Sequence, residues 1–398
     1  MIHAAATTVF WTCVAAVVWV YFGYPAALRA GWLGRRRSFT RRESFPLVSV
    51  IIPARNEESS IKAKIRNLLS SDYPRDRLEI LVGSDGSSDR TAQIVERFAS
   101  DGVGLISFPQ HRGKSFIQNG LVDASSGSIL IFTDADCFVA SHALRLLVAN
   151  FADPRVGLVT ACPCYRNADE SSTTHNEGLY LRYETWLRNG ESERGILAMG
   201  SGALFAMRRS LWQPLDAHHG DDFVLPLQVA RTGMKNILDT CVVAFTRLAQ
   251  SEPQAMLRLK VRIVSKDFRA LLANRALLNP FRYGAVAIAL WSHKLLRWLV
   301  PFFLLALLSS NLDLLSGPLA RITLALQVAF YLLALVGFVL RGRRNRGPWS
   351  VPLSFCVVNV AAALGILKCL SGRPSGMWET ERAPSAETVR FDRRLSAD

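Results

Sequence analysis

The sequence predicts an α/β domain with a mostly parallel sheet, joined to apolar membrane helices at both ends of the chain. Between Ser44 and about Arg282, short apolar runs alternate with amphipathic stretches and polar loops. This alternation is typical of an open parallel sheet with crossover helices. Outside that region, nearly uncharged apolar segments reach the length of a membrane span. Half of the 398 residues are hydrophobic and the net charge is +15, a combination that soluble globular proteins rarely show.

The elements of the predicted sheet follow one another along the chain. Short apolar runs rich in β-branched residues predict strands at 47–54, 79–85, 104–108 and 128–134. Amphipathic stretches between these runs predict helices at 59–71, 90–100 and 114–126. In the first helix, Ile61, Ile65 and Leu68 recur at helical spacing behind Ser59 or Ser60 as a cap. Such a sheet binds its ligand at the carboxyl ends of its strands.

Three or four further segments predict membrane helices, since about 20 apolar residues span a bilayer. They are Ala4–Leu28, Leu295–Leu315, Leu319–Leu340 and Val351–Leu370. The first segment has no preceding basic region and is longer than a signal-peptide core, which predicts an uncleaved anchor. The arginines that begin at Arg35 predict a cytoplasmic flank and an external N-terminus. Arginines also follow Leu370, so the positive-inside rule gives conflicting orientations for the last segment. The number of C-terminal crossings therefore stays open.

Clustered arginines supply much of the positive charge. One group comprises 35–37 and 41–42, and another comprises Arg341, Arg343, Arg344 and Arg346. Each group lies beside a long apolar run, which favours the anionic face of a membrane over nucleic acid as the partner. A solvated basic loop is the simpler interpretation of each group taken alone.

The cysteines indicate neither a disulfide framework nor a structural zinc site. The chain has seven of them, without a CxxC pair and without Cys/His spacing suited to zinc. Cys162 and Cys164, on either side of a proline, are expected to serve packing. The free thiols are compatible with a reducing cytosol.

Acidic residues stand at three places where a parallel sheet would present a ligand site. Asp85 closes the second predicted strand, Asp134 and Asp136 close the fourth, and Asp221 and Asp222 open an amphipathic helix. Singly, each has a structural explanation, such as a turn or favourable negative charge at a helix N-terminus. The Asp134–Asp136 pair alone leaves three readings open: a polar loop, an acid–base couple or an oxygen clamp for a metal ion.

The order of six motifs is more specific than any one of them. The chain reads VSVIIPARNEE, GSDGSSDRT, HRGKSFIQNG, FTDADC, GSGALFAMRR and GDDF, in that sequence. This series resembles the family 2 glycosyltransferases, which are inverting enzymes of GT-A fold, over about Val48 to Lys266. The C-terminal apolar helices resemble those of bacterial exopolysaccharide, poly-N-acetylglucosamine and hyaluronan-synthase-like enzymes.

The resemblance implies a nucleotide-sugar site. Asp85 matches the aspartate that hydrogen-bonds the base, commonly uracil, and Lys114 matches a basic residue near the diphosphate. Asp134 and Asp136 match the DxD motif, whose carboxylates engage the sugar nucleotide and a divalent metal, Mg²⁺ or Mn²⁺. The full set expected at the donor is Pro53, Asn56, Glu57, Asp85, Gly86, Lys114, Asp134, Ala135, Asp136 and Arg262.

The resemblance also implies a catalytic base and an acceptor side. Asp222 matches the base, at the second position of the acidic pair. A carboxylate placed to take the acceptor hydroxyl proton typically contributes about 10²–10⁴-fold in rate. Gly200, Ser201, Gly202 and Asp221 are expected near the acceptor, since small residues let a sugar approach the backbone closely. A simple turn before a strand explains the glycines equally well.

One departure concerns processive synthesis. Processive family members carry Q/RxxRW before the membrane channel. Here Arg262 keeps the arginine of this motif, but Leu259 replaces its first residue and Ile263 replaces its tryptophan. Whether synthesis is processive therefore stays open.

A late Trp378 resembles a cytoplasmic motif of hyaluronan-type enzymes. His293, Lys294 and Arg297 are expected at the cytoplasmic lip of the second apolar segment, where snorkelling is favoured over contact with lipid headgroups or a polyanionic acceptor.

The resemblance implies an enzyme of hexosyltransferase class at the inner (plasma) membrane, multi-pass, with its catalytic domain in the cytoplasm. It would move a sugar from a UDP-hexose or UDP-N-acetylhexosamine to a glycan or lipid-linked acceptor. Its partners would be the donor, the acceptor and membrane lipids, with no nucleic acid, and polysaccharide export components are open. Polyprenyl-phosphate sugar transfer and a catalytically inactive sugar-nucleotide-binding subunit are the alternatives.

The expected domain organisation has five parts along the chain. They are an anchor over 1–30, a GT-A domain over 44–250, interfacial helices over 251–290, a transmembrane bundle over 291–371 and a polar tail over 372–398.

Overall fold

The computed structural model describes residues 2–165, 172–246, 253–340 and 347–372. These residues fall into two compact units. The sheet unit consists of the described parts of 36–166 and 191–249, and the helical unit consists of those of 1–35, 167–190 and 250–375. The second arginine cluster, Trp378 and the tail beyond Gly372 lie outside the described residues.

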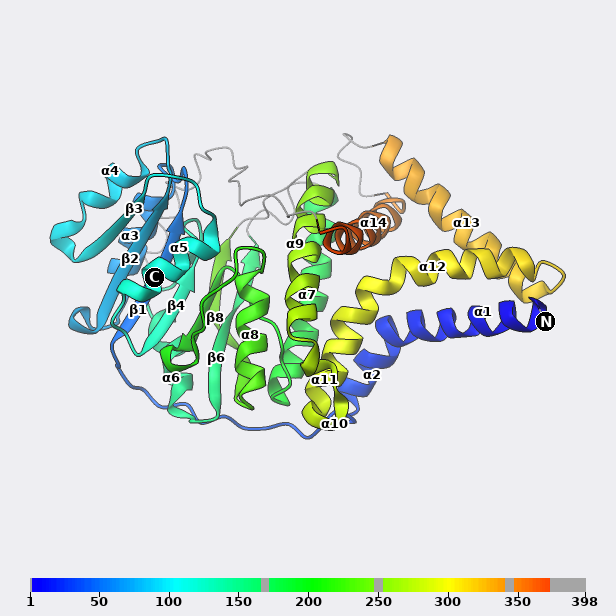
Figure 1. Ribbon diagram of the computed structural model, residues 1–398, viewed down its shortest axis with the longest axis horizontal. Coiled ribbons are helices and arrows are strands. Elements are labelled where there is room, and N and C mark those ends of the chain that lie inside the picture. The colour runs from blue at the N-terminus through cyan, green and yellow to red at the C-terminus, as the bar shows by residue number, and fades with distance from the viewer. Residues whose placement is uncertain (1, 166–171, 247–252, 341–346, 373–398) are drawn as a thin grey trace. The chain divides into compact units, whose positions relative to one another are not determined.

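Eight strands within the described ranges form one mixed sheet in the order β3-β2-β1-β4-β7-β6-β8-β5 (Figure 1). They are β1 (Val48–Ala54), β2 (Leu78–Asp85), β3 (Val103–Phe108), β4 (Ile129–Thr133), β5 (Phe138–Val139), β6 (Val156–Tyr165), β7 (Leu204–Arg208) and β8 (Lys235–Thr246). β1 to β4 run parallel, and β7 lies antiparallel to both β4 and β6. The loops that follow the parallel strands therefore meet at one edge of the sheet.

Helices of the sheet unit cover the central strands β1 and β4, which are buried along their whole length. Every residue of β1 is buried, as expected for a parallel strand with both faces covered. The helices are α3 (Ile61–Leu69), α4 (Thr91–Glu96), α5 (Lys114–Ala124), α6 (Ala143–Ala149) and α8 (Asp221–Arg231). The predicted α/β sheet is confirmed, with one difference of detail. The predicted helix over 90–100 is shorter, because a 3₁₀ turn, Ala99–Asp101, replaces its last turn.

The helical unit contains long and short helices drawn from three separate stretches of sequence. They are α1 (Ile2–Val18), α2 (Tyr24–Arg29), the part of α7 (Ser172–Glu193) up to Gly190, α9 (Pro253–Ala273), α10 (Pro280–Tyr283), α11 (Ala285–Ala289), α12 (Leu296–Asp313), α13 (Pro318–Val339) and α14 (Ser350–Leu370). One π-helical segment joins α1 to α2, and a second, Leu290–Leu295, joins α11 to α12. Within the unit, α9 packs on α14 and α1 packs on α12.

Four stretches of the described chain are long and apolar enough to cross a membrane. They are His3–Arg29, Ala285–Asp313, Pro318–Val339 and Ser350–Leu370. Three or four apolar helices were expected near these positions. The second begins ten residues before its predicted start at Leu295, because the short helix and the π-helical segment ahead of α12 continue it.

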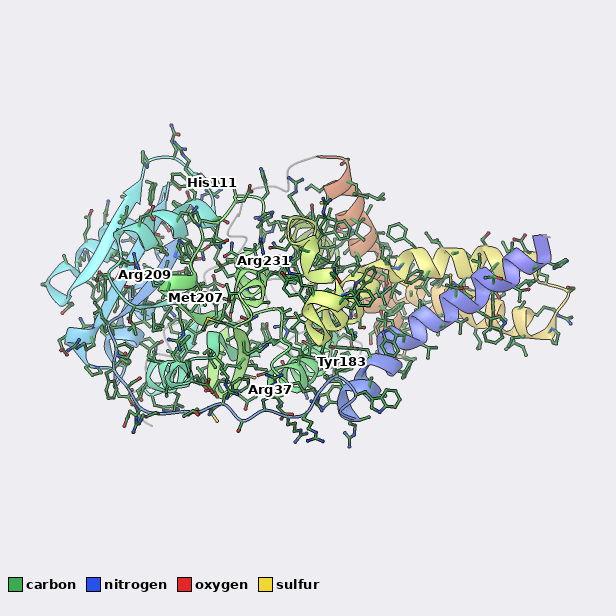
Figure 2. The ribbon with its side chains drawn as sticks, turned by 60° about the horizontal axis from the view of Figure 1, so that its bottom comes forward. Arg37, His111, Tyr183, Met207, Arg209 and Arg231 are labelled. Carbon is green, nitrogen blue, oxygen red and sulfur yellow. The ribbon has the colours of Figure 1, made fainter. Side chains whose placement is uncertain are left out.

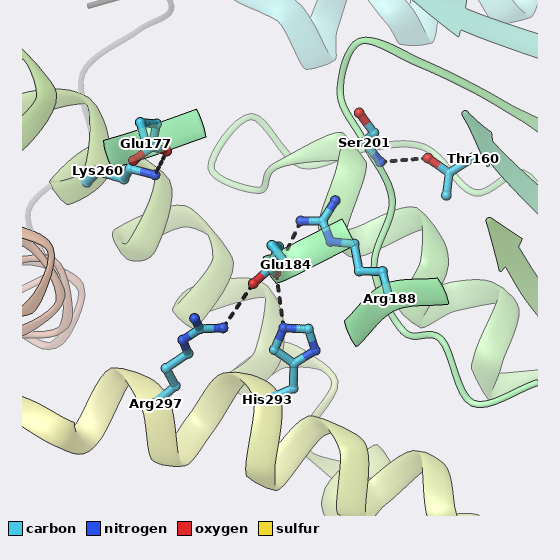
Figure 3. Close-up of polar contacts among 8 residues, drawn as sticks. All are labelled: Thr160, Glu177, Glu184, Arg188, Ser201, Lys260, His293 and Arg297. Atoms are coloured by element: carbon cyan, nitrogen blue, oxygen red, sulfur yellow. Dashed lines mark hydrogen bonds and ion pairs between the residues drawn. The ribbon is translucent and has the colours of Figure 1, made fainter. Parts of the chain in front are cut away.

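A buried carboxylate organises the polar interior of the helical unit. Glu184 of α7 accepts hydrogen bonds from His293 Nε2 at 3.0 Å and from an Arg297 Nη at 2.9 Å, with Arg188 at 3.4 Å (Figure 3). Burial alone would raise the pKa of Glu184, but His293 and Arg297 outweigh it and hold the pKa well below its usual range. The expected snorkelling of His293 and Arg297 is therefore replaced by internal pairing, because α7 brings a carboxylate to them.

Candidate active site

Carboxylates from two elements meet at Lys114, the first residue of α5. Its Nζ lies 3.0 Å from Asp134 Oδ1, in the loop after β4, and 3.1 Å from Asp221 Oδ2, at the start of α8. Asp136 follows in the same loop as Asp134. The structure therefore brings together the expected diphosphate lysine, the DxD pair and the acidic pair.

The strand order explains how these distant residues meet. β4 ends at Thr133, which lies opposite Leu204 at the start of the antiparallel strand β7. The segment that enters β7 consequently runs beside the loop that leaves β4, and Asp134 N donates to the carbonyl of Ala203 at 3.4 Å. This places Gly200–Gly202 at the same edge of the sheet as the aspartates.

The central ion pair keeps its charges at neutral pH. Burial would lower the pKa of Lys114, but Asp134 and Asp221 outweigh it and raise the pKa above its ordinary value. Burial would raise the pKa of Asp221, and Lys114 and a hydrogen bond from Gln118 Nε2 at 2.7 Å hold it below its ordinary value. The site therefore holds a lysine ammonium between two carboxylates.

The two aspartates of the acidic pair have different surroundings. Asp221 is buried and bonded to Lys114, whereas Asp222 is half-buried. The backbone carbonyl of Asp222 accepts from Gly200 N at 2.7 Å, and a Cβ placed on Gly202 would lie 3.5 Å from Asp222 Oδ2. That contact at Gly202 is of ordinary length, whereas a Cβ on Gly200 would lie 3.1 Å from the Asp222 carbonyl oxygen, so Gly200 is the glycine that permits the close approach of Asp222.

Ser201, between these glycines, is fixed from the neighbouring strand β6. Its backbone amide donates to Thr160 Oγ1 at 2.8 Å (Figure 3), and both residues are buried. A buried backbone amide that is hydrogen-bonded holds its segment in one position. The loop beside Asp222 is therefore anchored in the core of the sheet unit.

The loop after β1 is tied to the loop after β2. Asn56 has a positive φ of 52°, and its Oδ1 accepts from Ser88 N at 2.9 Å. Glu57 is buried and its Oε2 accepts from Ser60 Oγ at 2.5 Å. Pro53 lies within β1, one residue before its end. Asn56 and Glu57 thus have structural partners, and their contact with a nucleotide stays a prediction.

Asp85 holds the segment that precedes α5. The carboxylate is fully buried and accepts from the backbone amides of Arg112 at 2.6 Å and Gly113 at 2.9 Å. His111, labelled in Figure 2, lies with its Nδ1 2.7 Å from Asp85 Oδ2. Gly86 has a φ of +61°, and a Cβ there would meet His111 N at 2.8 Å, so only glycine fits.

A protein-family model matches the part of the chain that carries most of this site. Residues 49–214, which run from β1 past β7, match the family model described as glycosyl transferase family 2. These residues form a family 2 glycosyltransferase domain. The match covers Asp85, Lys114 and the DxD pair, and it ends before the acidic pair at the start of α8.

Curated relatives are similar over part of their length. The chain is 30% identical over 241 residues to "Probable glycosyltransferase YdaM" of Bacillus subtilis, covering 54% of this chain and 56% of that protein. It is 30% identical over 173 residues to "Beta-monoglucosyldiacylglycerol synthase" of Trichormus variabilis, covering 42% of this chain and 37% of that protein. The chain thus spans about half or less of the length of these relatives.

A solved structure shares the fold along nearly the whole chain. It is the mannosyltransferase PcManGT from Pyrobaculum calidifontis, in complex with GDP-Man and Mn²⁺. The similarity has a TM-score of 0.68 and 21% identity, and it covers 93% of this chain and 99% of that one. This similarity establishes the GT-A fold.

The family 2 domain has oxygen ligands that fit a shared metal site. Among the residues that the structure describes, no three His, Cys, Asp or Glu side chains are placed to hold an ion by themselves. Asp134 and Asp136 offer carboxylates from one half-buried loop. Mg²⁺ commonly binds one or two carboxylates together with water and substrate phosphates, so this donor set fits an ion that is held jointly with a nucleotide.

Two of the expected donor residues differ from the rest in their position. Ala135 is buried between the DxD aspartates, so its backbone is what a ligand would meet. Arg262 lies on α9 in the helical unit, whereas the other expected donor residues lie in the sheet unit. Its role at the diphosphate stays a prediction.

Sequence reasoning missed two polar residues that contact this site, one on α5 and one in the segment before it. Gln118 binds Asp221, and His111 binds Asp85. Gln118 follows Lys114 by one helical turn and lies between the buried Ile117 and the rest of the apolar face of α5. The sequence signal that could have found Gln118 is a polar residue on the otherwise apolar face of the predicted helix.

Proposed function

We propose that the chain is an inverting glycosyltransferase that moves a sugar from a nucleotide-sugar donor to a hydroxyl acceptor at a membrane. The observation that carries this proposal is the meeting of Asp134, Lys114 and the acidic pair at the edge where the parallel strands of a family 2 domain end. Ligands of open α/β sheets bind at that edge.

Asp222 is the proposed catalytic base. Asp221 is buried in an ion pair with Lys114, which leaves Asp222 as the half-buried member of the pair. A carboxylate at that position takes the proton of the acceptor hydroxyl as the hydroxyl oxygen attacks the anomeric carbon. One displacement from the face opposite the leaving group inverts the anomeric configuration.

The leaving nucleoside diphosphate carries negative charge that needs a partner. Lys114 Nζ lies 3.0 Å from Asp134 of the DxD pair, and part of its side chain is exposed, so it is able to contact phosphate. A divalent cation held by Asp134 and Asp136 supplies a Lewis acid at the diphosphate. The loop fixed by Asp85 is proposed to receive the nucleobase.

The donor and the acceptor are proposed by class. A UDP-linked hexose or N-acetylhexosamine is the proposed donor. One relative is named for making a glucosylated diacylglycerol, and others, 29% identical, are named poly-beta-1,6-N-acetyl-D-glucosamine synthase. These names favour testing a lipid and a growing glycan as acceptors. We also propose that the apolar helices cross the plasma membrane and leave the sheet unit in the cytoplasm.

The test uses the full chain in native membranes or nanodiscs. Transfer from UDP-glucose, UDP-N-acetylglucosamine and GDP-mannose is measured with Mg²⁺ or Mn²⁺, and the anomer of the product is read by NMR. Asp222→Asn should abolish transfer and leave donor binding within about twofold, since removal of a general base costs about 10²–10⁴-fold. Asp76→Asn, on an exposed 3₁₀ turn, is the matched control and should keep full activity.

The outcomes separate the proposal from its alternatives. Transfer only to a polyprenyl phosphate would establish that alternative acceptor. Donor binding without turnover for any donor and metal would indicate an inactive binding subunit and overturn the enzymatic proposal. Full activity of Asp222→Asn would move the base to another residue.

A further inference from the structure

A lysine and an asparagine lie on the buried face of α3. Lys64 has no exposed surface and Asn67 is 7% exposed, and both lie among apolar side chains that include Ile61, Ile65 and Leu68. The two polar residues are three positions apart, so they project from the same side of the helix. No role for them has been assigned so far.

Both side chains bond to the loop that carries the DxD aspartates. Lys64 Nζ donates to Thr133 Oγ1 at 2.8 Å and to the carbonyl of Cys137 at 2.5 Å. Asn67 Nδ2 donates to the carbonyl of Val139 at 2.8 Å, and Asn67 Oδ1 accepts from Val139 N at 3.0 Å. The contacts bracket the loop, since one lies just before Asp134 and the others lie just after Asp136.

A buried ammonium group requires a physical reason. Taking such a charge out of water costs several kcal/mol unless it is paired and hydrogen-bonded. The pKa of Lys64 is lowered, because burial outweighs the opposite effects of Cys137 and of the Asp134 and Asp136 carboxylates. An apolar side chain would pack well against Ile65 and avoid the cost, so packing alone does not explain a lysine here.

We propose that Lys64 is a positioning residue that holds the DxD loop from behind, with Asn67 fixing the end of that loop. The inference rests on the proposed function, because it assigns a role toward the metal-bound diphosphate of the donor. Lys64 is fully buried and therefore cannot touch a ligand; it acts through the loop. Lys114, by contrast, contacts Asp134 and has 19% of its side chain exposed.

The charges near the loop support this assignment. Lys64 bonds to Thr133 and Cys137 and Lys114 bonds to Asp134, so both ammonium groups reach the loop, and the site carries the carboxylates of Asp134, Asp136 and the acidic pair. Like charges this close repel one another, and a fixed cation behind the loop lowers the cost of holding them together. Lys64 thus prepares the aspartates for a divalent ion before a donor arrives.

The experiment compares Lys64→Met with Lys62→Met in the full chain in nanodiscs. Both substitutions replace a lysine of α3 by a side chain of similar length, but Lys62 is exposed. Binding of UDP and GDP is measured by calorimetry with Mn²⁺ and with EDTA, and binding of Mn²⁺ alone is measured by electron paramagnetic resonance. Melting temperatures report the folding of each variant.

Lys64→Met should weaken Mn²⁺-dependent nucleotide binding by about 10–100-fold, the usual effect of losing a residue that orients metal ligands. Binding of the same nucleotide in EDTA should change by less than about twofold, and Lys62→Met should match the wild type. A general structural defect would weaken both kinds of binding, so the ratio between them is the decisive readout.

Thr133→Val provides an independent variant if Lys64→Met does not fold. It keeps the volume of the side chain and removes the hydroxyl that accepts from Lys64 Nζ and donates to the carbonyl of Ala203 at 3.0 Å. It should weaken Mn²⁺-dependent binding by at least about fivefold, since each lost hydrogen bond is worth about 1 kcal/mol. Equal Mn²⁺-dependent affinity of the wild type and the variants would overturn the inference alone. Failure of the wild type to bind either nucleotide would overturn the proposed function as well.

Discussion

The ion pair between Lys114 and Asp221 permits a quantitative prediction for Lys114→Met. Their charged atoms lie 3.1 Å apart, and 19% and 9% of the two side chains is exposed. At an effective dielectric constant near 20, unit charges at that distance attract by about 5 kcal/mol. Part of this energy offsets desolvation, and removing one partner of a buried pair costs about 3–5 kcal/mol. We expect a loss of about 3 kcal/mol, near the lower limit of that range.

The assay is thermal unfolding of the full chain in detergent, followed by tryptophan fluorescence. For a domain of this size, each kcal/mol shifts the melting temperature by about 2–4 °C, so Lys114→Met should lower it by about 6–12 °C. Asp221→Asn and the double variant complete a double-mutant cycle, and the double variant should be more stable than the sum of the single effects predicts. Additivity within about 0.5 kcal/mol would refute the pairing.

The same pair predicts a pH dependence whose sign follows from the two pKa shifts. The pKa of Asp221 is lowered on folding, so its contribution is present above the unfolded value of about 4 and is lost as the pH falls. The pKa of Lys114 is raised, so its contribution is present below about 10.4 and is lost as the pH rises further. The stability difference between wild type and Lys114→Met should therefore be constant from about pH 5 to 10 and shrink in acid.

Three further predictions address the loops, the helical unit and the metal. Gly86→Ala should lower the melting temperature more than Gly113→Ala. Both glycines have positive φ, but only a Cβ at Gly86 would meet a backbone atom, His111 N at 2.8 Å. Equal shifts of the melting temperature would contradict this reasoning. Glu184→Ala should cost about 3–5 kcal/mol, whereas exposed Arg182→Ala should stay within about 0.5 kcal/mol. EDTA should abolish transfer and Mn²⁺ should restore it, and persistent activity in EDTA would count against a metal at the DxD pair.

Most of the sheet follows from local sequence. β1 and β4 are short, continuous apolar runs, and such runs are the clearest strand signal when turns bound them. No helix was predicted over the residues of α7, because its buried face is lined with polar residues such as Glu184 that pair within the helical unit. Apolar periodicity does not detect a helix that is stabilised by buried ion pairs.

The strand-end aspartates of the site were accessible to sequence reasoning, but their partners were not. The order of motifs selected Asp134 and Asp222, while the pairing of Lys114 with Asp221 depends on α5 and α8 meeting in space. Lys64 lies in a stretch that reads as an ordinary amphipathic helix. Its importance appears only when its long side chain is seen to reach Thr133, a contact between residues far apart in sequence.

The origin of α7 in the sequence limits how this protein can be divided. α7 lies between β6 and β7 along the chain, yet its residues up to Gly190 belong to the helical unit. A soluble fragment cut from the sheet unit as one continuous piece would keep α7 and lose His293 and Arg297. Of its partners in the described chain, Glu184 would then keep only Arg188, which lies on the same helix, and the buried face of α7 would be exposed to water. The sheet unit and the helical unit are thus encoded in interleaved segments, so no single cut along the chain separates one intact unit from the other.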